Sequence, residues 1–249
     1  MNWNGTISLL IACLEFLLLL NLLIIAEKNR LNKIAITMVA LLASYQFMEF
    51  LMCQVELQNS FFPYFAFGII TFLPPLNLLL TLSLKLEPEH KPASGGGHQR
   101  RLNLISIVIF FPSIFFILYY TTSISQFAVT SCTVLYATYH FPLGDLYGFF
   151  YYLPILTSIV LLIKLVRTET DKKKKIIGKV LLVGACFISL PVVIGFLLMI
   201  SGNFSIISAI ESIMCKFAFV YALCLGFICF YNSLFRDERN YFRFLFSNK

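Results

Sequence analysis

The sequence predicts an all-α membrane protein built as a bundle of seven transmembrane helices, and three observations predict this class. Hydrophobic residues make up 59% of the 249 residues and charged residues only 12%, and the mean hydropathy is +0.85, which is far too apolar for a soluble domain of this length. Seven apolar stretches approach or exceed the roughly 20 residues that cross a hydrocarbon core. The basic residues gather in alternate connections between those stretches.

The predicted spans take up most of the chain, which we treat as one domain over residues 1–249. They lie at residues 5–26, 34–54, 64–84, 103–121, 146–166, 177–200 and 206–231. The connections between them are too short to hold a catalytic domain, so we expect a protein that is not an enzyme. Residues 232–249 mix aromatic side chains with arginines, which predicts a cytoplasmic tail that lies in the membrane interface.

The charge distribution predicts the orientation of the chain. The net charge is +7, and every Lys and Arg except Lys216 lies in the first, third or fifth connection with its flanking span ends, or in the C-terminal tail. By the positive-inside rule, the N-terminus lies outside and the C-terminus in the cytoplasm. We interpret the basic runs as topology signals that contact lipid head groups in the cell membrane. No nucleic-acid-binding motif accompanies the charge, so we expect no nucleic-acid partner.

The second span carries a polar stripe in its outer half. Gln46, Glu49 and Cys53 are spaced i, i+3 and i+7, which places them on one helical face. A polar stripe on a helix in lipid points toward the bundle interior. Cys53 lies at the outer end of this span and Cys132 in an outer connection, where an oxidising exterior would join them. Because sequence does not give their separation, we treat the pair as a candidate disulfide.

Two further segments predict local structure. Pro74 and Pro75 lie in the middle of the third span, which predicts a kink and freed backbone carbonyls. The outer connection 121–145 is rich in Val, Thr and Tyr at 129–139, which favours a short hairpin or lid. His140 and Asp145 follow it as candidates for the entrance to a pocket, although a solvated loop explains them equally well. The aromatic run at 147–152 is typical of an interfacial belt.

The composition argues against metal and catalytic sites. The seven cysteines contain no CxxC pair, and five of them fall inside spans, where a thiol behaves as a small apolar group. A membrane zinc hydrolase needs several histidines in its bundle, but none of the three histidines lies inside a span. We find no Ser-His-Asp or Cys-His arrangement. We therefore expect no metal and no cofactor.

Four charged residues lie inside predicted spans, and they are the candidate functional site. They are Glu15, Glu49, Glu211 and Lys216, and Gln46 shares the face of Glu49. A charge at bilayer depth costs at least a few kcal/mol, so it normally faces the bundle interior and has a partner. In a ring of seven helices, the first lies beside the second and the seventh, which would bring these residues together. Lys216 is expected to pair with Glu15 or Glu49, and at least one carboxyl group to hold a proton.

Several interpretations of this set stay open. The first is a receptor-like or sensory protein with a polar pocket that opens to the outside, a small-molecule ligand and a cytoplasmic signalling partner. The second is a channel or transporter that uses the acids as relay sites for protons or cations, although no internal repeat supports it. The purely structural interpretation is a buried ion pair that fixes helix packing.

A third functional interpretation comes from a limited resemblance. A lysine in the seventh helix of a bundle with an outside N-terminus resembles the Schiff-base position of microbial rhodopsins, and Pro191 in the sixth span adds to the likeness. The resemblance implies a retinal-binding photoreceptor with the chromophore on Lys216. It covers little beyond these two positions, since Ser212 stands where the family has an acid one turn before the lysine.

Overall fold

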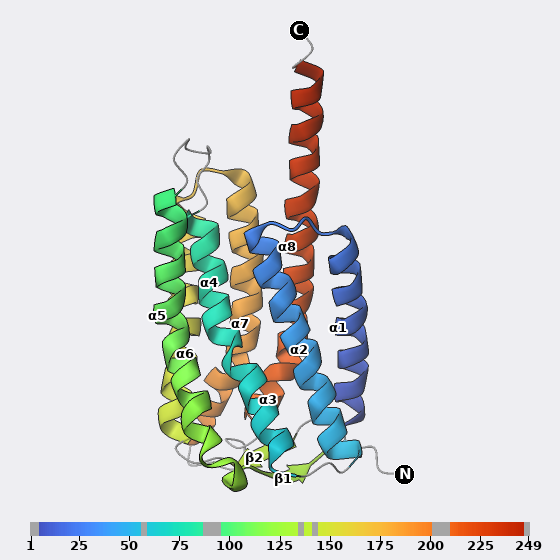
Figure 1. Ribbon diagram of the computed structural model, residues 1–249, viewed down its shortest axis with the longest axis vertical. Helices are drawn as coiled ribbons and strands as arrows, with labels where there is room; N and C mark the ends of the chain where they lie inside the picture. The colour runs from blue at the N-terminus through green and yellow to red at the C-terminus, as the bar shows by residue number, and fades with distance from the viewer. Residues whose placement is uncertain are drawn as a thin grey trace.

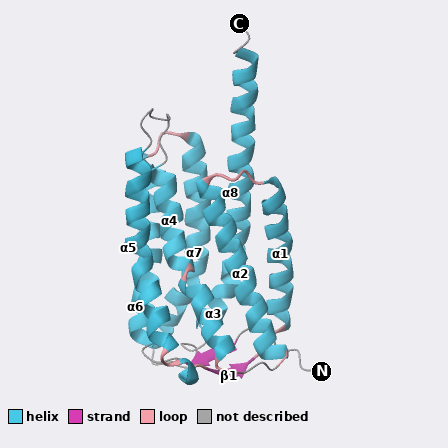
Figure 2. Cartoon of the chain, in the orientation of Figure 1, coloured by secondary structure: helices cyan, strands magenta, loops and turns pink. Residues whose placement is uncertain are grey.

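The computed structural model describes residues 5–55, 59–86, 96–133, 137–140, 144–200 and 210–246. Within these ranges it gives only the backbone at 96–104, 137–140, 144–145, 195–196, 198–200, 210–212 and 235–246. The described residues are almost entirely helical (Figure 2). The helices are α1 (Thr6–Ile25), α2 (Arg30–Gln54), α3 (Phe61–Thr71), α4 (Leu73–Leu86), α5 (Gly96–Thr121), α6 (Gly144–Thr168), α7 (Lys172–Ile200) and α8 (Ile210–Phe246).

The helices confirm the all-α class and support a multi-pass membrane protein. Six helical segments among the described residues are long and apolar enough to cross a membrane: Thr6–Ile25, Arg30–Gln54, Phe61–Leu86, Leu146–Thr168, Lys172–Ile194 and Ile213–Leu234. A shorter apolar helix, Ile105–Thr121, coincides with the fourth predicted span. Seven spans and the orientation of the chain therefore stay predictions.

The bundle has two distinct ends, which Figure 1 shows plainly. The α1–α2 and α6–α7 connections lie at one end, together with their basic residues. The 3₁₀ turn η1 (Ile124–Gln126) and the strands β1 (Ala128–Cys132) and β2 (Ala137–His140) lie at the other. We call this second end the hairpin end. Its position opposite the basic connections agrees with the alternation on which the predicted orientation depends.

The third predicted span is broken between α3 and α4, as its prolines predict. The break falls at Phe72, just before Pro74 and Pro75. Pro75 has no N–H to donate to the carbonyl of Thr71 four residues earlier. The Ser113 hydroxyl of α5 donates to that carbonyl instead, at 3.1 Å. The Thr71 hydroxyl also lies 2.9 Å from the Tyr147 hydroxyl of α6, so the break is tied to two neighbouring helices.

Aromatic residues form a buried cluster toward the hairpin end. The cluster comprises Phe67, Phe116, Tyr120, Phe127, Tyr147, Tyr151, Ile155 and Met214. The prediction that the run at 147–152 is an interfacial belt was therefore wrong for two of its members. Tyr147 and Tyr151 are four residues apart and share the inward face of α6, whereas the ring of Phe149 is exposed. Helical periodicity decides which rings enter the core.

The predicted hairpin forms and is tied to the bundle at several points. Strands β1 and β2 pair antiparallel, with Val129 opposite Tyr139. Cys132 is joined to Cys53 at the end of α2 by a disulfide, with their Cα atoms 5.5 Å apart. The backbone N–H of Gly5 donates to the carbonyl of Thr133 at 3.0 Å.

Gly5 caps α1 in a conformation that favours glycine. Its φ of +75° lies in the left-handed region, where other residues are strained. A Cβ atom at this position would also lie 3.1 Å from the Cβ of Cys53. The start of α1, the end of α2 and the hairpin are therefore packed closely together.

Helix α8 packs against α1, α2 and α7 and continues beyond the bundle. Buried residues recur along it at helical spacing, including Met214, Ala218, Tyr221, Leu225 and Ile228. Beyond the bundle its backbone continues as one helix to Phe246 (Figure 1). The sequence predicts that the tail 232–249 lies in the interface, whereas this backbone extends away from the other helices. No proline or glycine occurs between 233 and 246 to end the helix.

Candidate functional site

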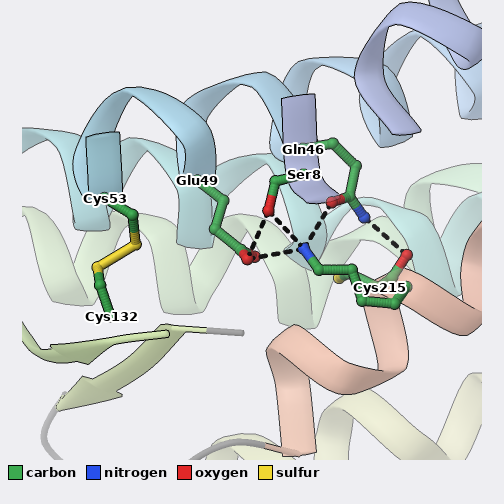
Figure 3. Close-up of polar contacts among 7 residues, drawn as sticks. Ser8, Gln46, Glu49, Cys53, Cys132 and Cys215 are labelled. Carbon is green, nitrogen blue, oxygen red and sulfur yellow. Dashed lines mark hydrogen bonds and ion pairs between the residues drawn. A yellow bond between two sulfur atoms is a disulfide. The ribbon is translucent and has the colours of Figure 1, made fainter. Parts of the chain in front are cut away.

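Four side chains from three helices form a buried charged cluster near the hairpin end (Figure 3). The cluster comprises Ser8 of α1, Gln46 and Glu49 of α2, and Lys216 of α8. Lys216 Nζ lies 2.7 Å from Glu49 Oε1, which is an ion pair. The same nitrogen donates to Gln46 Oε1 at 2.7 Å and to Ser8 Oγ at 2.9 Å. The structure thus brings together three of the predicted residues, and Ser8 joins them.

Helical spacing places each member of the cluster. On α1 the buried residues are Ser8, Ala12, Glu15 and Leu22, a narrow stripe at i, i+4, i+7 and i+14 that faces the neighbouring helices, while the rest of the helix is half-buried or exposed. On α2, Gln46 and Glu49 lie one turn apart on the predicted face, and Cys53 continues that face to the disulfide. Ser8 was missed because a lone serine in an apolar span gives no sequence signal.

Every donor of the Lys216 ammonium is used. It carries three N–H donors, and they match the three oxygens of Ser8, Gln46 and Glu49. The Ser8 hydroxyl donates in turn to Glu49 Oε1 at 2.9 Å, and Gln46 Nε2 donates to the backbone carbonyl of Cys215 at 2.7 Å. The positive and negative charges therefore compensate each other within a closed network, which joins α8 to both α1 and α2.

Glu15 does not join this network. Its side chain is fully buried, and neither carboxyl oxygen has a hydrogen-bond partner in the part of the chain that the structure describes. Of the two acids predicted as partners for Lys216, the structure selects Glu49. A buried carboxylate without partners is costly, so the geometry favours a Glu15 carboxyl group that holds a proton.

Three of the predicted site residues cannot be placed by their side chains. The backbone of Glu211 lies in the first turn of α8, that of His140 ends β2, and that of Asp145 lies at the start of α6. Their side chains are outside the described part of the structure. The proposed roles of Glu211 in the site and of His140 and Asp145 at an entrance therefore stay predictions.

A cavity lies in the middle of the bundle, beside the charged cluster. Its volume is about 30 Å³, measured as the space open to the centre of a water molecule. Residues of α2, α4, α6, α7 and α8 line it: Met38, Leu42, Leu73, Pro74, Asn77, Tyr151, Ile155, Ala185, Ile188, Met214, Cys215, Ala218 and Tyr221. The sequence predicts a pocket lined by Gln46, Glu49, Glu211 and Lys216. Gln46, Glu49 and Lys216 do not line this cavity, which is mostly apolar.

A second polar cluster, which the sequence analysis missed, holds α8 at the other end of the bundle. It comprises Asn32 of α2 with Asn232 and Ser233 of α8, and we call it the asparagine cluster. Asn232 Nδ2 donates to Asn32 Oδ1 at 3.0 Å, and Asn32 Nδ2 donates to Ser233 Oγ at 3.3 Å. Lys173 Nζ donates to the carbonyl of Asn232 at 3.2 Å. The cluster was missed because polar residues at the end of a span are equally typical of a loop.

No protein-family model, curated protein or solved structure matches this chain. No group of three His, Cys, Asp or Glu side chains that could hold a metal ion occurs among the described residues. Function must therefore be argued from the two polar clusters, the cavity and the course of α8.

Proposed function

We propose that this protein is a receptor-like membrane protein in which α8 carries a signal from the charged cluster to the opposite side of the membrane. The observation that carries the proposal is the position of Lys216. It lies near the start of α8, and its ammonium group joins that helix to α1 and α2. The same helix runs through the bundle and continues beyond it to Phe246. A change at the cluster can therefore act on the part of α8 outside the bundle.

A buried ion pair suits a two-state element. Separating Lys216 from Glu49 would leave two charges without partners in an apolar surrounding, which is strongly unfavourable. The helices are thus held in one arrangement until a ligand or a change of protonation compensates those charges. In a packing role alone, the ion pair would add stability, but its removal would leave the arrangement of the helices unchanged.

The proposal is tested by the distance between the start of α2 and the part of α8 near the asparagine cluster. Spin labels are placed at Lys33 and Leu234, both exposed near the asparagine cluster, after Cys13 and Cys186 are replaced by serine. Double electron–electron resonance in nanodiscs then compares the unaltered cluster with Lys216→Met and Glu49→Gln. We expect both substitutions to add a second distance population. A control, Lys164→Met, removes an exposed lysine of α6 and should leave the distribution unchanged.

If Lys216→Met lowers thermal stability but leaves a single unchanged distance, the ion pair serves packing only. The retinal alternative has no support from the contacts of Lys216, whose amine is engaged by three oxygens. If the purified protein stays colourless after retinal is added, the retinal-binding alternative is excluded.

Proton or cation passage is a second candidate, because Glu15 favours it. A fully buried carboxyl group with no partner among the described residues is typical of intramembrane proton relays. Flux into liposomes that contain the purified protein tests this candidate, with Glu15→Gln and Glu49→Gln as variants. Proton or cation flux that both variants abolish would support a relay. The absence of flux in a folded, inserted sample would exclude it.

A further inference from the structure

The central cavity contains one polar group without a partner. Asn77 is 5% exposed, and its Oδ1 accepts a hydrogen bond from the Tyr221 hydroxyl of α8. Its Nδ2 makes no hydrogen bond to any described residue. Because that nitrogen is not among the fully buried side-chain atoms that have no partner, it keeps some accessible surface, and Asn77 lines the cavity.

The position of Tyr221 is fixed as well. Gly184 of α7 lies against the Tyr221 ring, and a Cβ atom at Gly184 would overlap the ring. The ring therefore stays against α7 while its hydroxyl holds the Asn77 carbonyl oxygen. This arrangement leaves the Asn77 amide N–H groups beside a mostly apolar space.

The cavity limits what can occupy it. No charged residue lines it, so a charged ligand would lose its hydration without compensation. The cavity volume of about 30 Å³ leaves room for a small molecule only. The occupant is therefore small and neutral.

The cavity also lies against the turn of α8 that precedes Lys216. Met214 and Cys215 line the cavity and directly precede Lys216. The Cys215 carbonyl accepts the hydrogen bond from Gln46. An occupant of the cavity thus contacts the turn of α8 that holds the ion pair.

We propose that the central cavity is a binding site for a small, neutral, mostly apolar molecule with one carbonyl-type oxygen, which accepts a hydrogen bond from Asn77 Nδ2. This inference rests on the proposed function, because it names the chemical class of the signal. Binding would press on the turn that contains Met214 and Cys215 and so act on Lys216.

Methionine methyl groups provide the test, because two of them line the cavity. The protein is labelled with ¹³C-methyl methionine in nanodiscs, and the probes are butan-2-one and 2-methylbut-1-ene, which differ only in C=O against C=CH₂. We expect saturable shifts at Met38 and Met214, and none at Met48 and Met52, which do not line the cavity. The ketone should reach half saturation at about tenfold lower concentration, as expected for one hydrogen bond.

Two variants complete the test. Asn77→Leu keeps the side chain's size and should make ketone and alkene bind alike, while Ala218→Val narrows the cavity and should weaken both. Equal chemical-shift changes at all four methionines that grow linearly with probe concentration would show that the probes only partition into lipid. This result would overturn the proposal. Equal affinity of the two probes for the unaltered protein would also overturn it.

The same samples separate this inference from the proposed function. Saturable binding of the ketone without a change in the Lys33 to Leu234 distance would support the site and contradict signalling by it. A distance change in Lys216→Met without saturable binding of the ketone would overturn the site alone.

Discussion

Lys216 lies in a run of apolar residues, where an unpaired ammonium would be expelled or neutralised. Its three hydrogen bonds and the ion pair with Glu49 compensate for the lost hydration. The stabilisation of such a pair is conditional: removing one partner leaves a buried charge, whereas removing both leaves an apolar contact. Mutation of one partner and of both therefore should have different effects.

We predict that Lys216→Met lowers the free energy of unfolding by about 3 kcal/mol, the scale for breaking a buried pair. The double variant Lys216→Met with Glu49→Leu should lose less than the sum of the two single variants, because no unpaired charge remains. Equilibrium unfolding in detergent measures both. A double variant that loses the full sum would show that the two side chains act independently. Lys164→Met serves as the matched control.

At the level of residues, the sequence predicted the stripe on α2 and Lys216 as a partner for an acid, but it did not predict which acid Lys216 contacts or that Ser8 takes part. The spacing of Gln46, Glu49 and Cys53 fixes one face of α2, whatever lies opposite. The choice of Glu49 over Glu15 depends on how α1 and α8 are rotated and shifted against α2, which spacing within one helix does not determine. Ser8 lies in the first turn of α1, just after Gly5, which packs closely against Cys53 at the end of α2.

At the level of elements, the hairpin and the end of α2 form one unit through their disulfide. The bond between Cys53 and Cys132 closes a loop of 79 residues. Closing a long loop restricts the unfolded chain. The sequence predicted this pair from its outer position, and the antiparallel strands then hold Cys132 over α2.

We expect that replacing both Cys53 and Cys132 by serine lowers the free energy of unfolding by about 2 to 4 kcal/mol. Intact mass before and after reduction checks the bond itself, since reduction adds two hydrogen atoms. The control replaces the exposed free cysteines Cys13 and Cys186 and should change stability little. An unchanged mass on reduction would mean that the bond is absent.

The break between α3 and α4 gives a prediction of its own. Ser113→Ala should lower stability by about 1 to 3 kcal/mol, because the Thr71 carbonyl loses the donor that replaces the missing N–H of Pro75. Pro75→Ala restores an N–H four residues after Thr71, so adding it to Ser113→Ala should recover part of the loss. Thermal unfolding of the two single variants and the double variant measures this. Strictly additive losses would argue against the exchange of donors.

At the level of the whole molecule, the basic connections and the hairpin lie at opposite ends of the bundle (Figure 1). The predicted orientation places the hairpin end outside, where a disulfide forms. Composition and charge alternation predicted this overall plan. The course of the tail was not predictable from its mixture of aromatic residues and arginines, which suits both an interfacial helix and an extension of α8.

The orientation is tested by labelling single cysteines in whole cells, in a background without free cysteines. Ser125→Cys at the hairpin end and Thr170→Cys in the α6–α7 connection are both exposed positions. We expect an impermeant maleimide to label Ser125→Cys in intact cells and Thr170→Cys only after the membrane is opened. Labelling of Thr170→Cys in intact cells, with Ser125→Cys protected, would reverse the orientation.

The central claim is that α8 couples the charged cluster to the asparagine cluster, although 16 residues separate Lys216 from Asn232. A double-mutant cycle of Lys216→Met and Asn232→Ala measures this coupling through free energies of unfolding. Distant, independent sites add within about 0.5 kcal/mol. If releasing one end of α8 already loosens the other, the double variant should lose at least about 1 kcal/mol less than the sum of the single variants. Strict additivity would contradict the claim.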